Sequence, residues 1–123
     1  MTTPRRRLGD LGERLAEQHL LAAGYHVREK NFRTRLGEID IVAEKAGVLV
    51  FVEVRTRRGS TMGTAAESLT PAKQKRLVSL AASYAQTRSD LPEGRRIDLI
   101  AVDLAPNGKI LSLQHIQGAV EAD

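Results

Sequence analysis

Four charged residues stand inside two apolar segments of the sequence. The segments are GEIDIVAEK (37–45) and VLVFVEVRT (48–56), and the charged residues are Glu38, Asp40, Glu53 and Arg55. Both segments have the composition of strands, along which side chains point alternately to the two faces. Glu38 and Asp40 therefore share one face of their strand, and Glu53 and Arg55 share one face of theirs. Charges buried in strands are costly unless they are paired, so these residues need one another or a ligand.

The connection between the two strands decides whether the acids meet. A two-residue loop at 46–47 pairs Lys45 with Val48, and counting back from that pair places Asp40 opposite Glu53. Their Cβ atoms would then lie roughly 5 Å apart. A three-residue loop without a bulge would instead place the two acids on opposite faces. The first arrangement predicts two repelling carboxylates that need a cation or a shared proton.

Two sources of positive charge are available to such a pair. Arg55 can supply part of it, and a hard divalent ion such as Mg²⁺ can supply more, because Mg²⁺ binds one or two carboxylates together with water and substrate phosphate. The alternative is a salt-bridge ladder on a half-exposed sheet. The neighbouring residues are too apolar for that reading: Ile39, Ile41, Val50, Phe51, Val52 and Val54.

The rest of the sequence predicts the elements that position these strands. Helical periodicity covers residues 8–24, which end at a glycine, and residues 71–87, which follow Thr70 as N-cap. Further strands are expected at 25–33, 95–104 and 109–117, with a hairpin turn at Asn107-Gly108 joining the last two. The order α-β-β-β-α-β-β over 123 residues predicts a single α/β domain, with helices flanking a mixed β-sheet.

Basic residues favour an anionic partner such as nucleic acid. The net charge is +4 and the isoelectric point is about 9.9. Arg5, Arg6 and Arg7 are expected in a flexible basic arm at 1–7, and Arg57 and Arg58 at the root of a mobile loop at 57–69 that is rich in turn-forming residues. Phosphate binding is the functional expectation for both groups, and a solvated charged run is the alternative.

The composition also bears on the compartment. Cys is absent, so the chain has neither a disulfide framework nor a thiolate metal site. No apolar run approaches the roughly 20 residues of a membrane helix, and no apolar signal core follows the basic N-terminus. These observations predict a cytoplasmic protein that does not associate with a membrane.

The order of the motifs resembles a known family. Asp40, twelve intervening residues and then Glu53-Val54-Arg55 are similar to the D…ExK core of the PD-(D/E)xK nucleases. Over about residues 9–104 the chain resembles the YraN family, also called UPF0102, which is related to archaeal Holliday-junction resolvases. The blocks that carry this resemblance are GERLAEQHLLAAGY, NFRTRLGEIDIVA, VFVEVRTR, KQKRL and RIDLIAV.

The resemblance implies a restriction-endonuclease-like fold and an endonuclease acting on DNA, including branched DNA. It also implies a Mg²⁺ or Mn²⁺ site formed by Asp40, Glu53 and the Val54 carbonyl, with Glu13 completing the metal ligands. From the residues alone, Glu13 falls at the edge of the apolar face of the first helix, which suits a boundary salt bridge equally well. A homodimer is a further expectation.

Two residues depart from the nuclease pattern. Ile39 stands where the pattern has proline, and Arg55 stands where it usually has lysine. Arginine stays protonated in proteins, so Arg55 can bind phosphate or stabilise developing charge but cannot act as a general base. Lys73 is a candidate substitute, because helical periodicity turns it toward the sheet near a helix N-terminus. The alternative is a lysine whose stem passes the edge of the core.

The remaining ionisable residues fit structural roles. His19 lies on the apolar face of the first helix and is expected to be a hydrogen-bonded core residue, while Asp98 is expected to contact a neighbouring strand or helix. Neither His26 nor His115 has a paired metal-ligand spacing. Three functions remain open at this point. They are a Mg²⁺-dependent endonuclease, a nucleic-acid-binding module without catalysis, and a protein-interaction domain.

Overall fold

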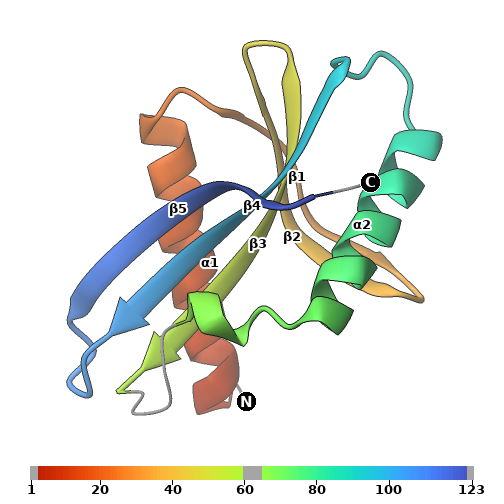
Figure 1. The fold of residues 1–123 in the computed structure, drawn as a ribbon. Coiled ribbons are helices and arrows are strands. Elements are labelled where there is room, and N and C mark those ends of the chain that lie inside the picture. Colours follow the sequence, from red (N-terminus) through yellow and green to blue (C-terminus); the bar gives the residue numbers. More distant parts are fainter. Residues whose placement is uncertain (1–2, 60–64, 122–123) are drawn as a thin grey trace.

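The computed structural model describes residues 3–59 and 65–121, which form one five-stranded sheet with a helix against each face (Figure 1). The elements are α1 (Pro4–Ala22), β1 (His26–Thr34), β2 (Gly37–Lys45), β3 (Val48–Arg58), the short 3-10 helix η1 (Ala66–Ser68), α2 (Pro71–Gln86), β4 (Gly94–Leu104) and β5 (Ile110–Val120). This order confirms the predicted α/β class. In the described part of the chain, no helix is long and apolar enough to cross a membrane.

The strands lie in the order β1-β2-β3-β4-β5 across the sheet. Only β3 and β4 run parallel, and the other three adjacent pairs are antiparallel. A parallel pair needs a crossover connection, and α2 provides it between β3 and β4. β1 and β5 are therefore the two edges of the sheet.

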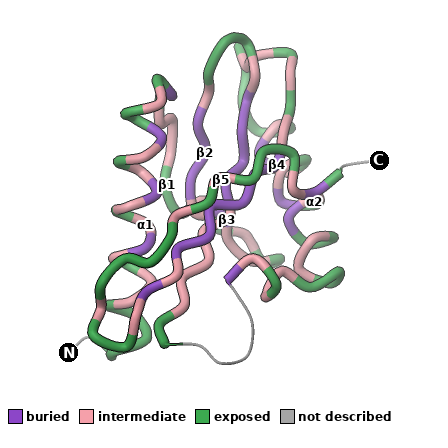
Figure 2. The backbone as a smooth tube through the Cα atoms, turned by 60° about the vertical axis from the view of Figure 1, so that its left-hand side comes forward, coloured by how far each residue is buried: buried purple, intermediate pink, exposed green. Residues whose placement is uncertain are grey.

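Each helix covers its own half of the core. On one face, Ala16 and Leu20 of α1 are fully buried against residues of β2, β3 and β4. On the other face, Leu80 and Tyr84 of α2 are buried against a second apolar cluster. The central strands are consequently buried on both sides, whereas β5 is exposed along most of its length (Figure 2).

The β2–β3 hairpin has the register that the two-residue loop predicts. Ala46 and Gly47 both have positive φ angles, 51° and 78°, as a tight turn of the type that favours hairpins requires. Lys45 consequently pairs with Val48. The expected carboxylate register therefore follows from this turn.

Beyond this ladder β2 and β3 separate. Their last paired residues are Ile41 and Val52, whereas β3 stays paired with β4 as far as Arg58. Figure 1 shows the lower ends of β2 and β3 diverging. Asp40 and Glu53 are the first residues past the last pair, and we call this place the strand fork.

Two predicted boundaries differ from the structure. Helix α1 begins at Pro4, because Thr3 caps it by accepting a hydrogen bond from the Arg6 backbone N–H at 3.1 Å. Arg5, Arg6 and Arg7 are thus helical rather than part of an arm. β3 extends to Arg58, and η1 occupies part of the loop expected at 57–69. Residues 1–2 of the arm and 60–64 of the loop lie outside the described residues.

Candidate active site at the strand fork

Asp40 and Glu53 lie side by side at the strand fork. The Val54 backbone N–H, which no longer has a partner on β2, donates to Asp40 Oδ2 at 2.7 Å. The carboxyl groups of Asp40 and Glu53 are also close enough to influence each other's ionisation. Burial first, and then the charge of Glu53, raise the pKa of Asp40 to about 9. Without a cation, the pair therefore holds a proton at neutral pH.

Helix α1 brings a third carboxylate to the fork. Gly12 permits a close approach to β3, because a Cβ atom at this position would lie 1.7 Å from Thr56 Oγ1. The next residue, Glu13, is half-buried. Burial raises its pKa to about 7, with further contributions from the charges of Asp40 and Glu38. Glu13 is thus electrostatically coupled to the fork and is more than a boundary residue.

Asn31 of β1 is a member of this cluster that the sequence reasoning missed. Its φ of 57° lies in the left-handed region, which asparagine adopts more readily than most residues. With its amide nitrogen turned toward the acids, Asn31 donates to Glu13 Oε1 at 3.0 Å and to Glu38 Oε1 at 2.5 Å. Arg33 Nε also donates to Glu38, at 3.2 Å. No motif marks Asn31; the pairing of Lys30 with Ile41 and of Phe32 with Ile39 places it opposite Asp40.

Arg55 lies beside the acids, and only part of its guanidinium group contacts them. Its terminal nitrogen forms an ion pair with Glu53 at 2.9 Å. Its Nε is buried and has no hydrogen-bond partner among the described residues. A buried donor without an acceptor is costly, so this nitrogen is suited to an anionic ligand such as a phosphate oxygen.

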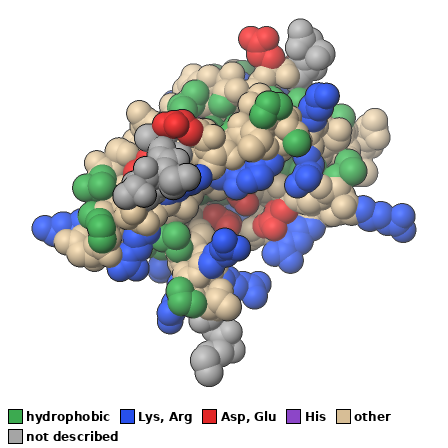
Figure 3. Space-filling model, turned by 60° about the horizontal axis from the view of Figure 1, so that its bottom comes forward, with side chains coloured by type: hydrophobic (Ala, Val, Ile, Leu, Met, Phe, Trp, Pro, Cys, Tyr) green, Lys and Arg blue, Asp and Glu red, His purple; other side chains and the backbone are tan. Residues whose placement is uncertain are grey.

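A cavity of about 800 Å³ opens beside the fork. The predicted site residues that line it come from α1, β3 and α2: Arg5, Glu13, Val54, Arg55, Arg57, Arg58 and Lys73. Figure 3 shows acidic side chains in a recess between Lys and Arg side chains on the corresponding face of the molecule. The cavity thus brings the Glu13 carboxylate together with cations up to 68 positions apart in the sequence, from Arg5 to Lys73, whereas Asp40 and Glu53 are not among its lining residues.

The other two arginines of the N-terminal group lie elsewhere. Arg7 lines a smaller hollow of about 170 Å³ on the neighbouring side of α1. Arg6 donates its backbone N–H to the helix cap and does not line the larger cavity. Arg58 reaches both hollows, and its Nε donates to the Pro106 carbonyl at 2.9 Å.

Comparison with known proteins identifies the family. The model of "Uncharacterised protein family UPF0102" matches residues 12–102. This chain belongs to family UPF0102. It is 48% identical over 123 residues to a UPF0102 protein of Roseiflexus castenholzii, covering 98% of each chain. It is 45% identical over 117 residues to one of Symbiobacterium thermophilum, covering 95% of this chain and 98% of that protein. A UPF0102 protein of Chloroflexus aurantiacus is 46% identical over the whole of both chains.

The fork has the donor chemistry of a magnesium site but not its assembled geometry. Asp40, Glu53 and Glu13 offer carboxylate oxygens, which hard cations prefer, and burial together with neighbouring acids raises the pKa values of Asp40 and Glu13. Within residues 3–59 and 65–121, no three His, Cys, Asp or Glu side chains stand in a metal-binding arrangement. Glu53 is oriented toward Arg55 instead. The residues fit a cation chemically, and binding would require Glu53 to turn.

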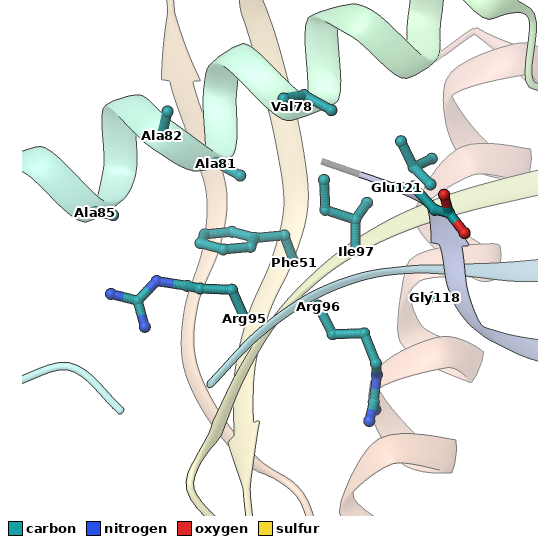
Figure 4. Close-up of a pocket in the computed structure, with 11 residues that line it drawn as sticks. Phe51, Val78, Ala81, Ala82, Ala85, Arg95, Arg96, Ile97, Gly118 and Glu121 are labelled. Carbon is teal, nitrogen blue, oxygen red and sulfur yellow. The ribbon is translucent and has the colours of Figure 1, made fainter. Parts of the chain in front are cut away.

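A second hollow, of about 660 Å³, is apolar and lies away from the fork (Figure 4). Small residues of α2, including Ala81 and Ala85, form one wall, while Phe51 and Ile97 lie on the sheet below them. None of the predicted site residues of this UPF0102 protein lines it. The charged cavity at the fork is therefore the candidate active site.

Proposed function

We propose that this UPF0102 protein is a divalent-metal-dependent endonuclease acting on DNA, branched DNA included. The proposal rests on one observation, which is that an acidic environment and a basic environment adjoin each other. Carboxylates with raised pKa values stand at the fork, and a cavity lined by arginines and a lysine opens directly beside them. Hydrolysis of a phosphodiester needs both, because a cation must bind near the scissile phosphate while other positive charges hold the backbone.

The cations of the cavity supply the phosphate contacts. Arg57 and Arg58 extend from the end of β3, and Arg5 faces the same cavity from the first turn of α1. Such contacts hold a nucleic acid without reading its sequence. Binding should therefore weaken steeply as salt concentration rises, with little preference among base sequences.

Arg55 and Lys73 divide the role that one lysine has in the nuclease pattern. Arg55 Nε is oriented by β3 and has no acceptor within the described part of the chain, so it would bind an oxygen of the phosphate. Lys73 occupies the third position of α2, where its backbone N–H donates to the Thr70 hydroxyl at 3.3 Å. Its side chain lines the same cavity, and a lysine pKa can shift where an arginine pKa cannot.

Asp40 and Glu53 would hold the metal, with the Val54 carbonyl and Glu13 as further ligands. When bound, a Mg²⁺ or Mn²⁺ ion would activate a water molecule and neutralise charge on the phosphate. Displacing the proton shared by Asp40 and Glu53 would accompany binding, so affinity for the metal should increase with pH.

The test is a cleavage assay on branched and linear DNA with Mg²⁺ or Mn²⁺. Asp40→Ala and Glu53→Ala should abolish cleavage and leave DNA binding unchanged or tighter, because a negative charge has left the site. Glu44→Ala is the matched control. It removes a carboxylate from the opposite end of β2, where Glu44 pairs with Arg28 at 3.1 Å, and should cut like the wild type. Cleavage that survives in both fork variants would refute the proposal.

A non-catalytic nucleic-acid-binding module is the second candidate. The ion pair between Arg55 and Glu53 favours it, because this contact holds a proposed metal ligand away from a metal. Arg55→Lys separates the two functions. In a nuclease it should increase cleavage by releasing Glu53 and restoring the usual lysine. If neither the wild type nor Arg55→Lys cuts any substrate, while both bind DNA in a salt-dependent way, the module is the correct function.

A further inference from the structure

Two histidines that are 96 positions apart in the sequence meet between α1 and β5. Nε2 of His19 lies 3.2 Å from Nδ1 of His115, and the two rings stand at 81° to each other with their centroids 5.2 Å apart. The His115 side chain is only 10% exposed, and His19 is half-buried. Neither histidine lines the charged cavity beside the fork, and the proposed nuclease reaction uses neither of them.

A buried carboxylate determines which nitrogen of His115 faces His19. Asp98 Oδ2 lies 2.7 Å from His115 Nε2, on the side of the ring away from His19. Arg96 donates twice to the same carboxylate and the Gly118 backbone N–H donates once, so Asp98 acts as an acceptor and His115 Nε2 carries the hydrogen. Nδ1 of His115 therefore presents a lone pair to His19. Metal-binding histidines commonly donate their other ring N–H to a carboxylate in this way.

The separation of the two facing nitrogens suits a hydrogen bond from His19 to His115, and it also suits one metal ion. Two nitrogens that bind one tetrahedral zinc ion at about 2.0–2.1 Å each are about 3.3 Å apart. The observed separation is 3.2 Å, so the rings would need to move very little. Burial, and then the neighbouring His115, lower the pKa of His19, which is therefore neutral near pH 7. Its hydrogen can then reside on Nδ1, which leaves Nε2 able to bind a metal.

We propose that His19 Nε2 and His115 Nδ1 form a zinc-binding site, with Asp98 as the residue that orients His115. Imidazole nitrogens suit Zn²⁺, whereas the carboxylate oxygens of the fork suit Mg²⁺ or Mn²⁺, so the two sites select different metals. Within residues 3–59 and 65–121, no group of three His, Cys, Asp or Glu side chains could hold a metal, so water molecules would complete the zinc coordination. Two protein ligands bind zinc less tightly than the four of a zinc finger.

Zinc at this position would join α1 to β5, the first and last elements of the chain. The two histidines are brought together only by folding, so the ion would bind the folded protein in preference to the unfolded chain and would stabilise the fold. The site shares no residue with the strand fork, where Asp40 and Glu53 lie on β2 and β3. Failure of either proposal would therefore leave the other intact.

Titration of the full chain with Zn²⁺, followed by NMR of the histidine rings, tests the proposal. The chain has three histidines, so each ring can be followed separately. Zinc should shift the signals of His19 Nε2 and His115 Nδ1 with a dissociation constant of about 1–100 µM, while His115 Nε2 stays protonated. His19→Gln, which keeps a good helix former on α1, should weaken binding at least ~10-fold. His26→Gln is the matched control, because His26 is exposed on β1, and it should bind like the wild type.

Three results would overturn the proposal. They are wild-type ring signals of His19 and His115 that stay unchanged up to about 1 mM zinc, zinc bound only by the carboxylates of the fork, and a His19→Gln variant that binds as tightly as the wild type. Asp40→Ala distinguishes the two sites, because it removes a fork carboxylate and should leave the histidine response to zinc unchanged. Mg²⁺ should not shift the ring signals of the wild type. Because the wild-type titration requires no substitution, the proposal stays testable even if a histidine variant fails to fold.

Discussion

Asp98 and Asp40 are two aspartates of the same sheet in opposite electrostatic situations. Asp98 in β4 is only 1% exposed and receives four hydrogen bonds. Arg96 donates twice, at 2.8 and 3.0 Å, and the Gly118 backbone N–H donates at 3.0 Å, while His115 Nε2 lies 2.7 Å away. Asp40 has one donor, the Val54 N–H, and acidic neighbours.

The Asp98 network extends outward and joins separate elements. His115 Nδ1 lies 3.2 Å from His19 Nε2 of α1, and Arg96 also donates to the Tyr25 hydroxyl at 2.7 Å. The network therefore ties α1, β4 and β5 together. A carboxylate that accepts this many hydrogen bonds stabilises the folded protein. A carboxylate crowded by other acids destabilises the folded protein unless a cation binds to it. Crowded acids of the second kind are typical of functional sites.

The largest expected effect comes from Asp98→Asn. The substitution keeps the shape of the side chain but removes the buried charge that balances the half-buried Arg96 guanidinium, and its amide N–H₂ would face other donors. We expect a loss of about 3 kcal/mol in the free energy of unfolding, measured by urea denaturation. Glu93→Gln, at an exposed position, should change it by less than ~0.5 kcal/mol. A small loss at Asp98 would remove the distinction between the two aspartates.

The same substitution at Asp40 should have the opposite sign. In Asp40→Asn the amide can donate to Glu53 as the protonated carboxyl does, its oxygen can still accept from the Val54 N–H, and folding no longer requires the side chain to take up a proton. We expect the free energy of unfolding to increase by roughly 1–2 kcal/mol at pH 8. Asp98→Asn measured under the same conditions is the control. If both substitutions destabilise equally, the fork is not electrostatically strained.

The pH dependence of stability sharpens this second prediction. The pKa of Asp40 is raised from 3.8 to about 9, and that of Glu13 from 4.5 to about 7, so the folded protein binds more protons than the unfolded chain between these values. Stability is therefore fully present below about pH 4 and decreases as pH rises toward 9. Denaturation across this range should show a shallower decrease in Asp40→Asn, and in the wild type when Mg²⁺ is added.

The sequence was sufficient to predict the structure wherever a local rule determines it. The Ala46-Gly47 turn predicted the hairpin register and, through it, that Asp40 and Glu53 are neighbours, because a two-residue loop leaves one way to pair the strands. Helical periodicity likewise turned Lys73 toward the sheet, and the structure places it in the charged cavity. His19 is hydrogen-bonded, as expected from its position on α1.

Features that depend on contacts distant in the sequence were not predictable in the same way. Asn31 joins the acid cluster through the register of the β1–β2 hairpin, in which a two-residue turn pairs Thr34 with Gly37, and that hairpin was not predicted from the sequence. Gly12 matters because Thr56 of another element occupies the space that a Cβ would need. The sequence does contain a feature that indicates a helix at Arg5. Thr3-Pro4 repeats the cap at Thr70-Pro71, but the cluster of arginines favoured an arm.

The smallest expected effect concerns Asn31, which moderates the repulsion at the fork. Asn31→Gly tolerates the φ of 57° and removes only the amide that donates to Glu13 and Glu38. Because that donor favours the ionised carboxylate, its loss should raise the pKa of Glu13 above about 7. The free energy of unfolding at neutral pH should fall by only about 0.5–1 kcal/mol.

Carboxyl NMR titration of Glu13 measures this directly. Asn107→Gly is the matched control, because the Asn107 side chain accepts from the Lys109 backbone N–H in the turn between β4 and β5. It should leave the Glu13 titration unchanged. An unaltered Glu13 pKa in Asn31→Gly would mean that Asn31 donates no hydrogen bond to the ionised carboxylate. In that case the raised pKa of Glu13 reflects burial and the neighbouring acids without any opposing donor, and the contrast with the fully satisfied Asp98 becomes larger.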